Sequence, residues 1–142
     1  MIKKFRGDYK WLSNMTPCKL TYNGIEYPSS EHAYMSAKSD DMTWKSLCAD
    51  KQKSGFYIKR ESQKIALIDD WDNIKFSVME EILRIKFESE PFKRLLQNTG
   101  NVEIQEGNTW NDLFWGVDLE TGKGKNNLGK IIMKIRNEKN EL

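Results

Sequence analysis

Residues 18–38, CKLTYNGIEYPSSEHAYMSAK, change from a strand pattern to a helix pattern and predict the centre of the fold. In the first half, apolar and polar residues alternate on both sides of an Asn-Gly dipeptide, which accepts the two positive-φ positions of a type I′ turn. This pattern predicts a β-hairpin over residues 18–27. The Pro-Ser-Ser segment at 28–30 then ends the strand and supplies the N-cap of a helix that begins near Glu31.

Helical patterns dominate the rest of the chain. Two helices are predicted over residues 44–53 and 60–69 with a break around Ser54-Gly55, and a longer one runs from Asp72 to Glu88. The apolar stripe of the long helix is wide enough to pack on two sides. We therefore expect an α+β fold, namely a compact, mostly helical single domain over residues 1–142 with a small β-hairpin. The remaining predicted elements are a short helix through Leu95 and Leu96 that ends at Gly100, a short strand at Val102 and Ile104, an irregular segment from Gly107 to Asn127, and a final amphipathic helix from Leu128 to Arg136.

Composition narrows the class of protein. The 142 residues include 5 Trp, 5 Tyr and 6 Phe, which is too aromatic for a disordered chain and suits one domain. The 23 Lys and Arg balance 21 Asp and Glu, so the broad basic footprint of a dedicated nucleic-acid binder is absent. Cys18 and Cys48 fit a reducing compartment. Because neither a signal peptide nor a membrane-length apolar run is present, we expect a cytoplasmic protein without membrane contact.

Two kinds of site are tested and set aside. Residues 124–130 fit the phosphate-binding pattern G-x-x-x-x-G-K, but Ile131 stands where a nucleoside triphosphatase needs Ser or Thr for Mg²⁺. A Gly- and Asn-rich loop that opens a helix can still offer backbone N–H groups to an anion. The alternative, which the sequence alone favours, is an ordinary N-cap with a flexible lead-in. His32 is the single histidine and the cysteines lack flanking ligands, so no metal site is expected.

Three places carry side chains that suit chemistry. Glu31 and Lys38 lie two helical turns apart and share a face, so they can do acid–base work in one pocket or simply form a solvated face, which the pattern favours. Trp71 can stack on a base, or it can staple onto a helix that Asp72 caps. Asp112 lies in an aromatic loop bounded by glycine, where burial is costly without a partner or ligand. Its alternative is a surface loop anchored by its aromatic residues.

One ordered set of motifs spans nearly the whole chain. Its members are Phe5-Arg6-Gly7, Leu12-Ser13-Asn14-Met15, Tyr27 to Tyr34 with Lys38, Trp71-Asp72, Met79, Lys86-Phe87, Leu96, Thr99-Gly100, Glu106, Asp112 with Trp115-Gly116, and Asn127 to Met133 with Arg136. In this order the motifs resemble the YbiA-like family, also called NADAR domains. One departure is the sequence Ile58-Lys59-Arg60-Glu61, where many members carry Gly-Arg.

The resemblance implies a metal-independent hydrolase of N-glycosidic bonds in ribose derivatives, without a cofactor. Members act on aminouracil ribosylamine phosphates of the riboflavin pathway, or remove ADP-ribose from guanine in nucleic acid. For this chain we expect the ADP-ribosyl-guanine substrate. The alternatives are the riboflavin intermediate and a non-catalytic module that binds ADP-ribose. The expected partner is therefore ADP-ribosylated nucleic acid or a small ribose-phosphate metabolite, with no obligate protein partner.

The resemblance also implies roles for particular residues. The catalytic work falls to Glu31, Trp71 and Asp112. Glu31 would stabilise the oxocarbenium-like state and activate water, Trp71 would stack on the base, and Asp112 would assist proton transfer or hold a ribose hydroxyl. Lys38 would orient Glu31 or capture the opened sugar as an imine. The expected substrate-binding residues are Asn14, His32, Tyr34, Lys59, Arg60, Trp115, Gly116, Asn127 and Lys130, and a lysine track for polynucleotide, or a solvated face, is formed by Lys123, Lys125, Lys130 and Lys134.

Overall fold

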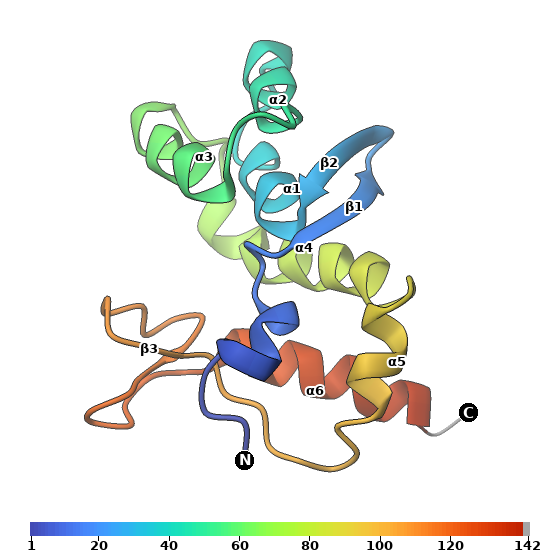
Figure 1. Cartoon of the computed structure of the whole chain (residues 1–142). Helices are drawn as coiled ribbons and strands as arrows, with labels where there is room; N and C mark the ends of the chain where they lie inside the picture. Colours follow the sequence, from blue (N-terminus) through green and yellow to red (C-terminus); the bar gives the residue numbers. More distant parts are fainter. Residues whose placement is uncertain (141–142) are drawn as a thin grey trace. The chain divides into compact units, whose positions relative to one another are not determined.

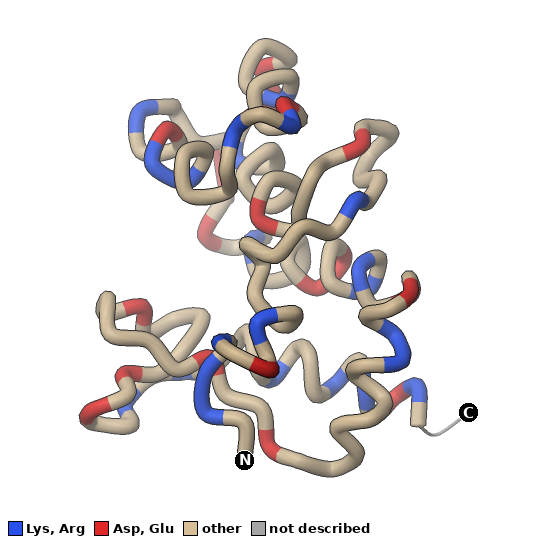
Figure 2. Tube along the Cα trace, in the orientation of Figure 1, with Lys and Arg blue, Asp and Glu red and all other residues tan. Residues whose placement is uncertain are grey.

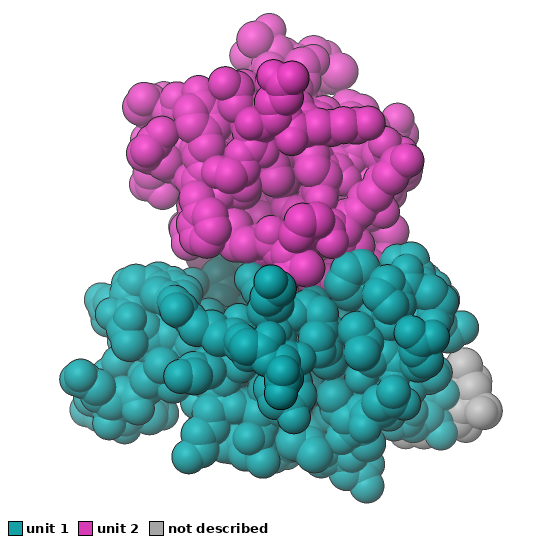
Figure 3. Space-filling model, viewed as in Figure 1, with its two compact units in different colours: residues 1–13, 87–142 teal, residues 14–86 magenta. Residues whose placement is uncertain are grey.

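The computed structural model describes residues 1–140 and has the α+β, mostly helical class that the sequence predicts (Figure 1). Two compact units share the chain. Unit 2 contains residues 14–86, and unit 1 contains residues 1–13 together with the chain from Phe87 onward (Figure 3). Unit 2 holds the hairpin and four helices, whereas unit 1 holds both chain ends.

The predicted hairpin is confirmed. Strand β1 (Pro17–Tyr22) pairs antiparallel with β2 (Ile25–Ser29). The turn residues Asn23 and Gly24 have φ values of 50° and 82°, as a type I′ turn requires. Side chains of β1 alternate between buried and exposed, so one face of the hairpin packs into the core of unit 2.

Helix α1 (Ser30–Ser36) follows the hairpin directly and is the centre of unit 2. Its N-cap is Ser29, whose hydroxyl accepts a hydrogen bond from the backbone N–H of His32. All seven residues of α1 are buried, and the helix packs against the hairpin, α2, α3 and α4. The helix begins one residue before the predicted Glu31.

The next helices correct the predicted boundaries. Helix α2 (Met42–Cys48) ends earlier than predicted, and α3 (Gly55–Glu61) begins where a break was expected. The hydroxyl of Ser54 caps α3 by accepting from the Tyr57 N–H, so the Ser-Gly pair starts a helix. A 3₁₀ turn (Ser62–Lys64) then ends the helical run, so the predicted helix over residues 60–69 is wrong.

The long helix α4 (Trp71–Lys86) is confirmed within two residues at each end. Its apolar stripe is half-exposed near the start, where Phe76 is 38% exposed, and buried only from Met79 onward. Asp72 does not cap the helix. Its carboxylate instead pairs with Lys75 at 3.2 Å, while the carbonyl of Asp70 accepts the first helical N–H groups.

Unit 1 is built around α6 (Asn127–Asn140), the predicted final helix, whose buried face is largely apolar. It also contains a 3₁₀ helix, η1 (Gly7–Leu12), and helix α5 (Phe92–Gln97). The segment expected to be irregular holds two short parallel strands, β3 (Gly107–Asn108) and β4 (Val117–Asp118). The predicted strand at Val102 and Ile104 is reduced to a single bridge between Ile104 and Ile2.

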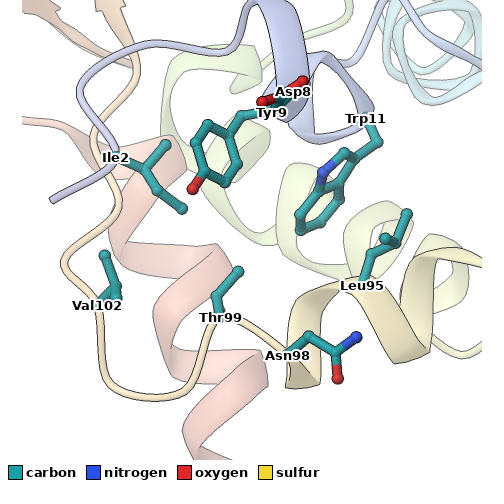
Figure 4. A pocket seen from close by; sticks show the side chains of 8 residues that line it. All are labelled: Ile2, Asp8, Tyr9, Trp11, Leu95, Asn98, Thr99 and Val102. Carbon is teal, nitrogen blue, oxygen red and sulfur yellow. The ribbon is translucent and has the colours of Figure 1, made fainter.

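A hollow of about 290 Å³ lies in unit 1 between η1 and α5 (Figure 4). Tyr9 and Trp11 contribute aromatic rings to it, and Thr99 lines it from the end of α5. The guanidinium of buried Arg136 donates to the Thr99 hydroxyl at 3.2 Å. None of the residues predicted to bind substrate lines this hollow.

Two further observations concern residues 1–140. Cys18 and Cys48 are both buried and unpaired with one another. None of the helices in this range has the length and apolar character needed to cross a membrane.

Candidate active site

Glu31 stands in the first turn of α1 and is held by its backbone. Its N–H donates to the Asn14 carbonyl at 3.0 Å, and the neighbouring Ser30 hydroxyl donates to the Asn14 side-chain oxygen at 2.8 Å. Asn14 is buried, so this predicted substrate contact serves to fix the start of α1. The carboxylate side chain of Glu31 is 7% exposed and lies where the dipole of a helix favours negative charge.

Gly55, the first residue of α3, lies directly against Glu31. A Cβ added at Gly55 would lie 3.4 Å from the Cβ of Glu31 and 2.7 Å from the sulfur of Met15. The sequence marks this glycine only as a break. Its packing role depends on a contact between residues that are far apart in sequence, so no periodicity could have predicted it.

Lys38 and two aromatic rings lie beside Glu31 in unit 2. The rings of Tyr34 and Trp71 are tilted against one another with centroids 5.3 Å apart, and the ammonium of Lys38 is 5.9 Å from the Tyr34 centroid. Lys38 also donates to the Ser62 hydroxyl at 3.4 Å. Burial lowers the pKa of Lys38, and the charge of Glu31 partly opposes that shift. The pair is thus electrostatically coupled and partly desolvated.

Two other lysines influence the same amine. The charges of Lys59 and Lys75 both lower the pKa of Lys38 further. Sequence analysis missed Lys75, although it lies four residues after Trp71 and therefore on the same face of α4. Lys59 and Arg60 are exposed on α3, and the Arg60 guanidinium lies 5.4 Å from the ring centroid of Tyr57.

His32 has both ring nitrogens engaged within unit 2. Nε2 is 2.7 Å from the Lys53 carbonyl, which can only accept, so Nε2 donates. In the neutral ring Nδ1 then accepts from the Ser29 hydroxyl at 2.6 Å. Since His32 is 4% exposed, this geometry assigns it to the hairpin–helix junction, in place of the predicted substrate contact.

The Asp112 loop is organised within unit 1. Oδ1 of Asp112 accepts from the backbone N–H groups of Phe114 at 3.2 Å and Trp115 at 3.0 Å, which tightens the loop into an Asx turn. The rings of Phe114 and Trp115 meet edge to face, with centroids 4.7 Å apart. The carboxylate is therefore held in a fixed orientation by the loop that it closes.

Asn108 anchors this loop and was missed by the sequence analysis. It is 1% exposed and forms three side-chain hydrogen bonds. Its amide accepts from the Asp112 N–H and donates to the Asp112 carbonyl and to the carboxylate of Glu106. A single sequence contains no sign of this role, because buried and solvated asparagines look alike in it.

Gly116 allows the chain to pass close to Glu106. A Cβ at Gly116 would lie 1.8 Å from the Glu106 carboxylate and 2.6 Å from the amide nitrogen of Asn108. No side chain fits there without displacing these groups. The position that was expected to contact substrate thus has a demanding packing role of its own.

The start of α6 does not present free N–H groups. Asn127 is half-buried and Lys130 is exposed, as phosphate contacts would require. However, the interpretation of this loop as an anion cradle is wrong, because four successive N–H groups are already bonded inside unit 1. The expected flexible lead-in is wrong for the same reason. The N–H groups of Lys125, Asn126, Asn127 and Leu128 donate to the carbonyls of Leu113, Gly116, Phe114 and Trp115.

The structure therefore brings together two sets of predicted site residues. Unit 2 groups Glu31, Tyr34, Lys38 and Trp71, and unit 1 groups Asp112 and its loop with the start of α6. Over residues 1–140, no cluster of three or more His, Cys, Asp or Glu side chains is placed to hold a metal ion.

Comparisons with known proteins agree with the motifs. The chain is 38% identical over 137 residues to a Vibrio vulnificus protein named riboflavin biosynthesis protein, a match that covers 94% of this chain and 36% of that one. The chain thus spans about a third of that relative's length. It is 31% identical over 134 residues to N-glycosidase YbiA of Escherichia coli, covering 92% of this chain and 82% of YbiA.

A solved structure and a family match complete the comparison. The NMR structure of the E. coli protein YbiA has a TM-score of 0.83 to this chain at 27% identity, and the match covers 99% of this chain and 88% of YbiA. The family match extends from residue 2 to residue 139, across both sets of site residues. The chain therefore belongs to the NADAR domain family.

Proposed function

We propose that this chain hydrolyses the N-glycosidic bond between a ribose C1 and a base. The main support is the group in unit 2, where buried Glu31 is electrostatically coupled to desolvated Lys38 beside the Tyr34–Trp71 pair. A carboxylate, an amine and an indole are the side chains that such a cleavage uses. Relatives named N-glycosidase support the same class of reaction.

The proposed reaction proceeds by departure of the base. The C1–N bond breaks, its electron pair stays with the base nitrogen, and a proton is added to that nitrogen. Glu31 stabilises the positive charge that develops on the ribose and takes a proton from the water that forms the new C1–O bond. Trp71 stacks on the departing base. Asp112, which its loop holds in a fixed orientation, is proposed to assist proton transfer or hold a ribose hydroxyl.

Lys38 has two possible parts in this reaction. Its charge can hold Glu31 ionised and oriented, as the coupling between the two groups favours. Alternatively, because burial lowers its pKa, a larger fraction of the amine is unprotonated and able to form an imine with the opened sugar, releasing water. Borohydride reduction during turnover would leave a stable adduct on Lys38 only in the second case.

ADP-ribosylated guanine in nucleic acid is the substrate that we propose first. The basic segment at residues 51–64, which includes the start of α3 against Glu31, supports a polyanionic substrate. A second candidate is an aminouracil ribosylamine phosphate, which the name of the riboflavin biosynthesis relative favours. Both candidates present a phosphorylated ribose with a base at C1.

The test compares wild type with Glu31→Gln on both substrates. One substrate is a DNA oligomer that carries ADP-ribose on guanine, the other is an aminouracil ribosylamine phosphate, and mass spectrometry follows the products. We expect release of ADP-ribose by wild type and a loss of at least about 100-fold in Glu31→Gln, the scale of a lost general base. Glu26→Gln, an exposed carboxylate on β2, is the matched control. Binding of ADP-ribose without cleavage of either bond would refute the proposal in favour of a binding module.

A further inference from the structure

Residues 51–64 carry an unusual concentration of positive charge. They contain five lysines and arginines and one acidic residue, so their net charge of +4 exceeds the +2 of the whole chain. Figure 2 shows the basic positions along α3 and the turn that precedes it. The one acidic side chain, Glu61, pairs with Lys64 at 2.7 Å. The rest of the segment therefore presents cations with little compensation.

Aromatic rings are interleaved with these cations. Phe56 is 69% exposed, although a phenylalanine in a folded chain is usually covered. The ring of Tyr57 has the Lys53 ammonium 5.0 Å from its centroid and the Arg60 guanidinium 5.4 Å from it. Exposed aromatic faces and cations within the same few residues are the two components of a surface that binds nucleic-acid strands.

The helix presents these side chains as a single fixed face. Ile58 is fully buried and anchors α3 against the rest of unit 2. On the exposed side, Phe56 lies one turn before Lys59 and Arg60, so a ring and two cations are neighbours. Because Ser54 caps the helix and Gly55 packs on Glu31, the face begins beside the proposed catalytic carboxylate.

We propose that this α3 surface, formed by Lys51, Lys53, Phe56, Tyr57, Lys59 and Arg60, binds a single-stranded nucleic acid. An unpaired base stacks on Phe56, and the flanking phosphates contact the lysines and Arg60. The inference rests on the proposed function, since the strand would be the polymer that carries the scissile N-glycoside. A membrane surface fits less well, because a helix that lies in lipid needs a long apolar face and the other aliphatic side chain of α3, Ile58, is buried.

Binding of a fluorescently labelled oligothymidine, measured by anisotropy across a range of salt concentrations, tests the surface. Phe56→Ala is expected to weaken binding about tenfold, the value of one stacked base. Lys51→Gln with Lys59→Gln is expected to reduce the slope of log K against log salt by about 1.4, since each lost phosphate contact removes about 0.7. Met42→Ala and the pair Lys4→Gln with Lys19→Gln remove equally exposed groups elsewhere and should change nothing.

Other arms separate this inference from the proposed function. Glu31→Gln should bind the oligomer as wild type does, because the α3 surface does not depend on the carboxylate for affinity. If wild type cleaves neither substrate but Phe56→Ala still weakens strand binding, the surface stands and the glycosidase proposal fails. Equal binding by wild type and Phe56→Ala would overturn the surface. So would tighter binding of duplex than of single strand, or binding to phosphatidylserine vesicles with none to the oligomer.

Discussion

Lys86 provides a quantitative test of how unit 2 is packed. It lies in the last turn of α4 with its side chain fully buried, and burial lowers its pKa to about 8. In the unfolded chain the same amine has its ordinary value of 10.5. Between these two values the unfolded chain binds more protons than the folded chain, so the contribution of Lys86 to the free energy of unfolding rises with pH. The difference corresponds to about 3 kcal/mol, at 1.36 kcal/mol for each pKa unit.

Other buried groups oppose this trend and must be cancelled. Burial raises the pKa of the Cys48 thiol from 9.0 to about 12, and it also raises the pKa of Tyr22 and Tyr27. Each of these groups stays protonated in the folded chain where the unfolded chain loses the proton. Their contributions to stability are therefore present at neutral pH and lost as the pH rises above about 9. The pH dependence of wild type alone would mix both signs.

The comparison of wild type with Lys86→Met isolates the lysine. Methionine preserves most of the apolar volume without a charge. Urea unfolding between about pH 7 and pH 11 should show the free energy of unfolding of wild type gaining about 3 kcal/mol relative to the variant as the pH rises. Any constant cost of lost contacts cancels in this slope. Parallel curves for the two proteins would refute the argument that Lys86 is buried with a lowered pKa.

Two further predictions concern side chains that bond to the backbone. Asn108→Ala removes three buried hydrogen bonds and should lower the free energy of unfolding by about 2–4 kcal/mol in urea, and it should reduce turnover more than Lys134→Ala, an exposed control. An Asn108→Ala protein with unchanged turnover would show that the Asp112 loop needs no anchor. Ser29→Ala removes the N-cap of α1 and leaves Nδ1 of buried His32 without its donor, so a loss of about 2–3 kcal/mol is expected in thermal unfolding. A loss below about 0.5 kcal/mol would contradict this account of the junction.

The sequence predicted the elements whose cause is local. The Asn-Gly turn, the Ser29 cap and the apolar faces of α4 and α6 each depend on residues within a few positions of one another, and the structure confirms all of them. The errors occur where one residue type has two local uses. Ser54 was interpreted as a helix break, but its hydroxyl caps α3, and Asp72 was interpreted as a cap where Asp70 supplies the accepting carbonyl.

Predictions about the site succeeded and failed for a comparable reason. The grouping of Glu31 with Lys38 follows from helical spacing, and their electrostatic coupling confirms it. The internal roles of Asn14, His32 and Asn108 follow from hydrogen bonds that bring together distant backbone and side-chain atoms, such as the bond from the Ser30 hydroxyl to Asn14. A polar residue in a motif can thus be required by the fold alone, and one sequence does not distinguish the two cases.

The glycines near α6 show why the phosphate-binding pattern is misleading here. A Cβ at Gly124 would lie 2.3 Å from the carbonyl oxygen of Gly116, and one at Gly129 would lie 2.3 Å from that of Ile104. Both glycines are therefore required by close packing of the chain on itself, which a nucleotide-binding loop requires for a different reason. Asn126, with φ of 52°, completes the arrangement by accepting from the Glu106 N–H and donating to the Ile104 carbonyl. The spacing that resembles a phosphate loop thus fixes the segment that holds Asp112, because the N–H groups that follow Gly124 bond to carbonyls of that loop.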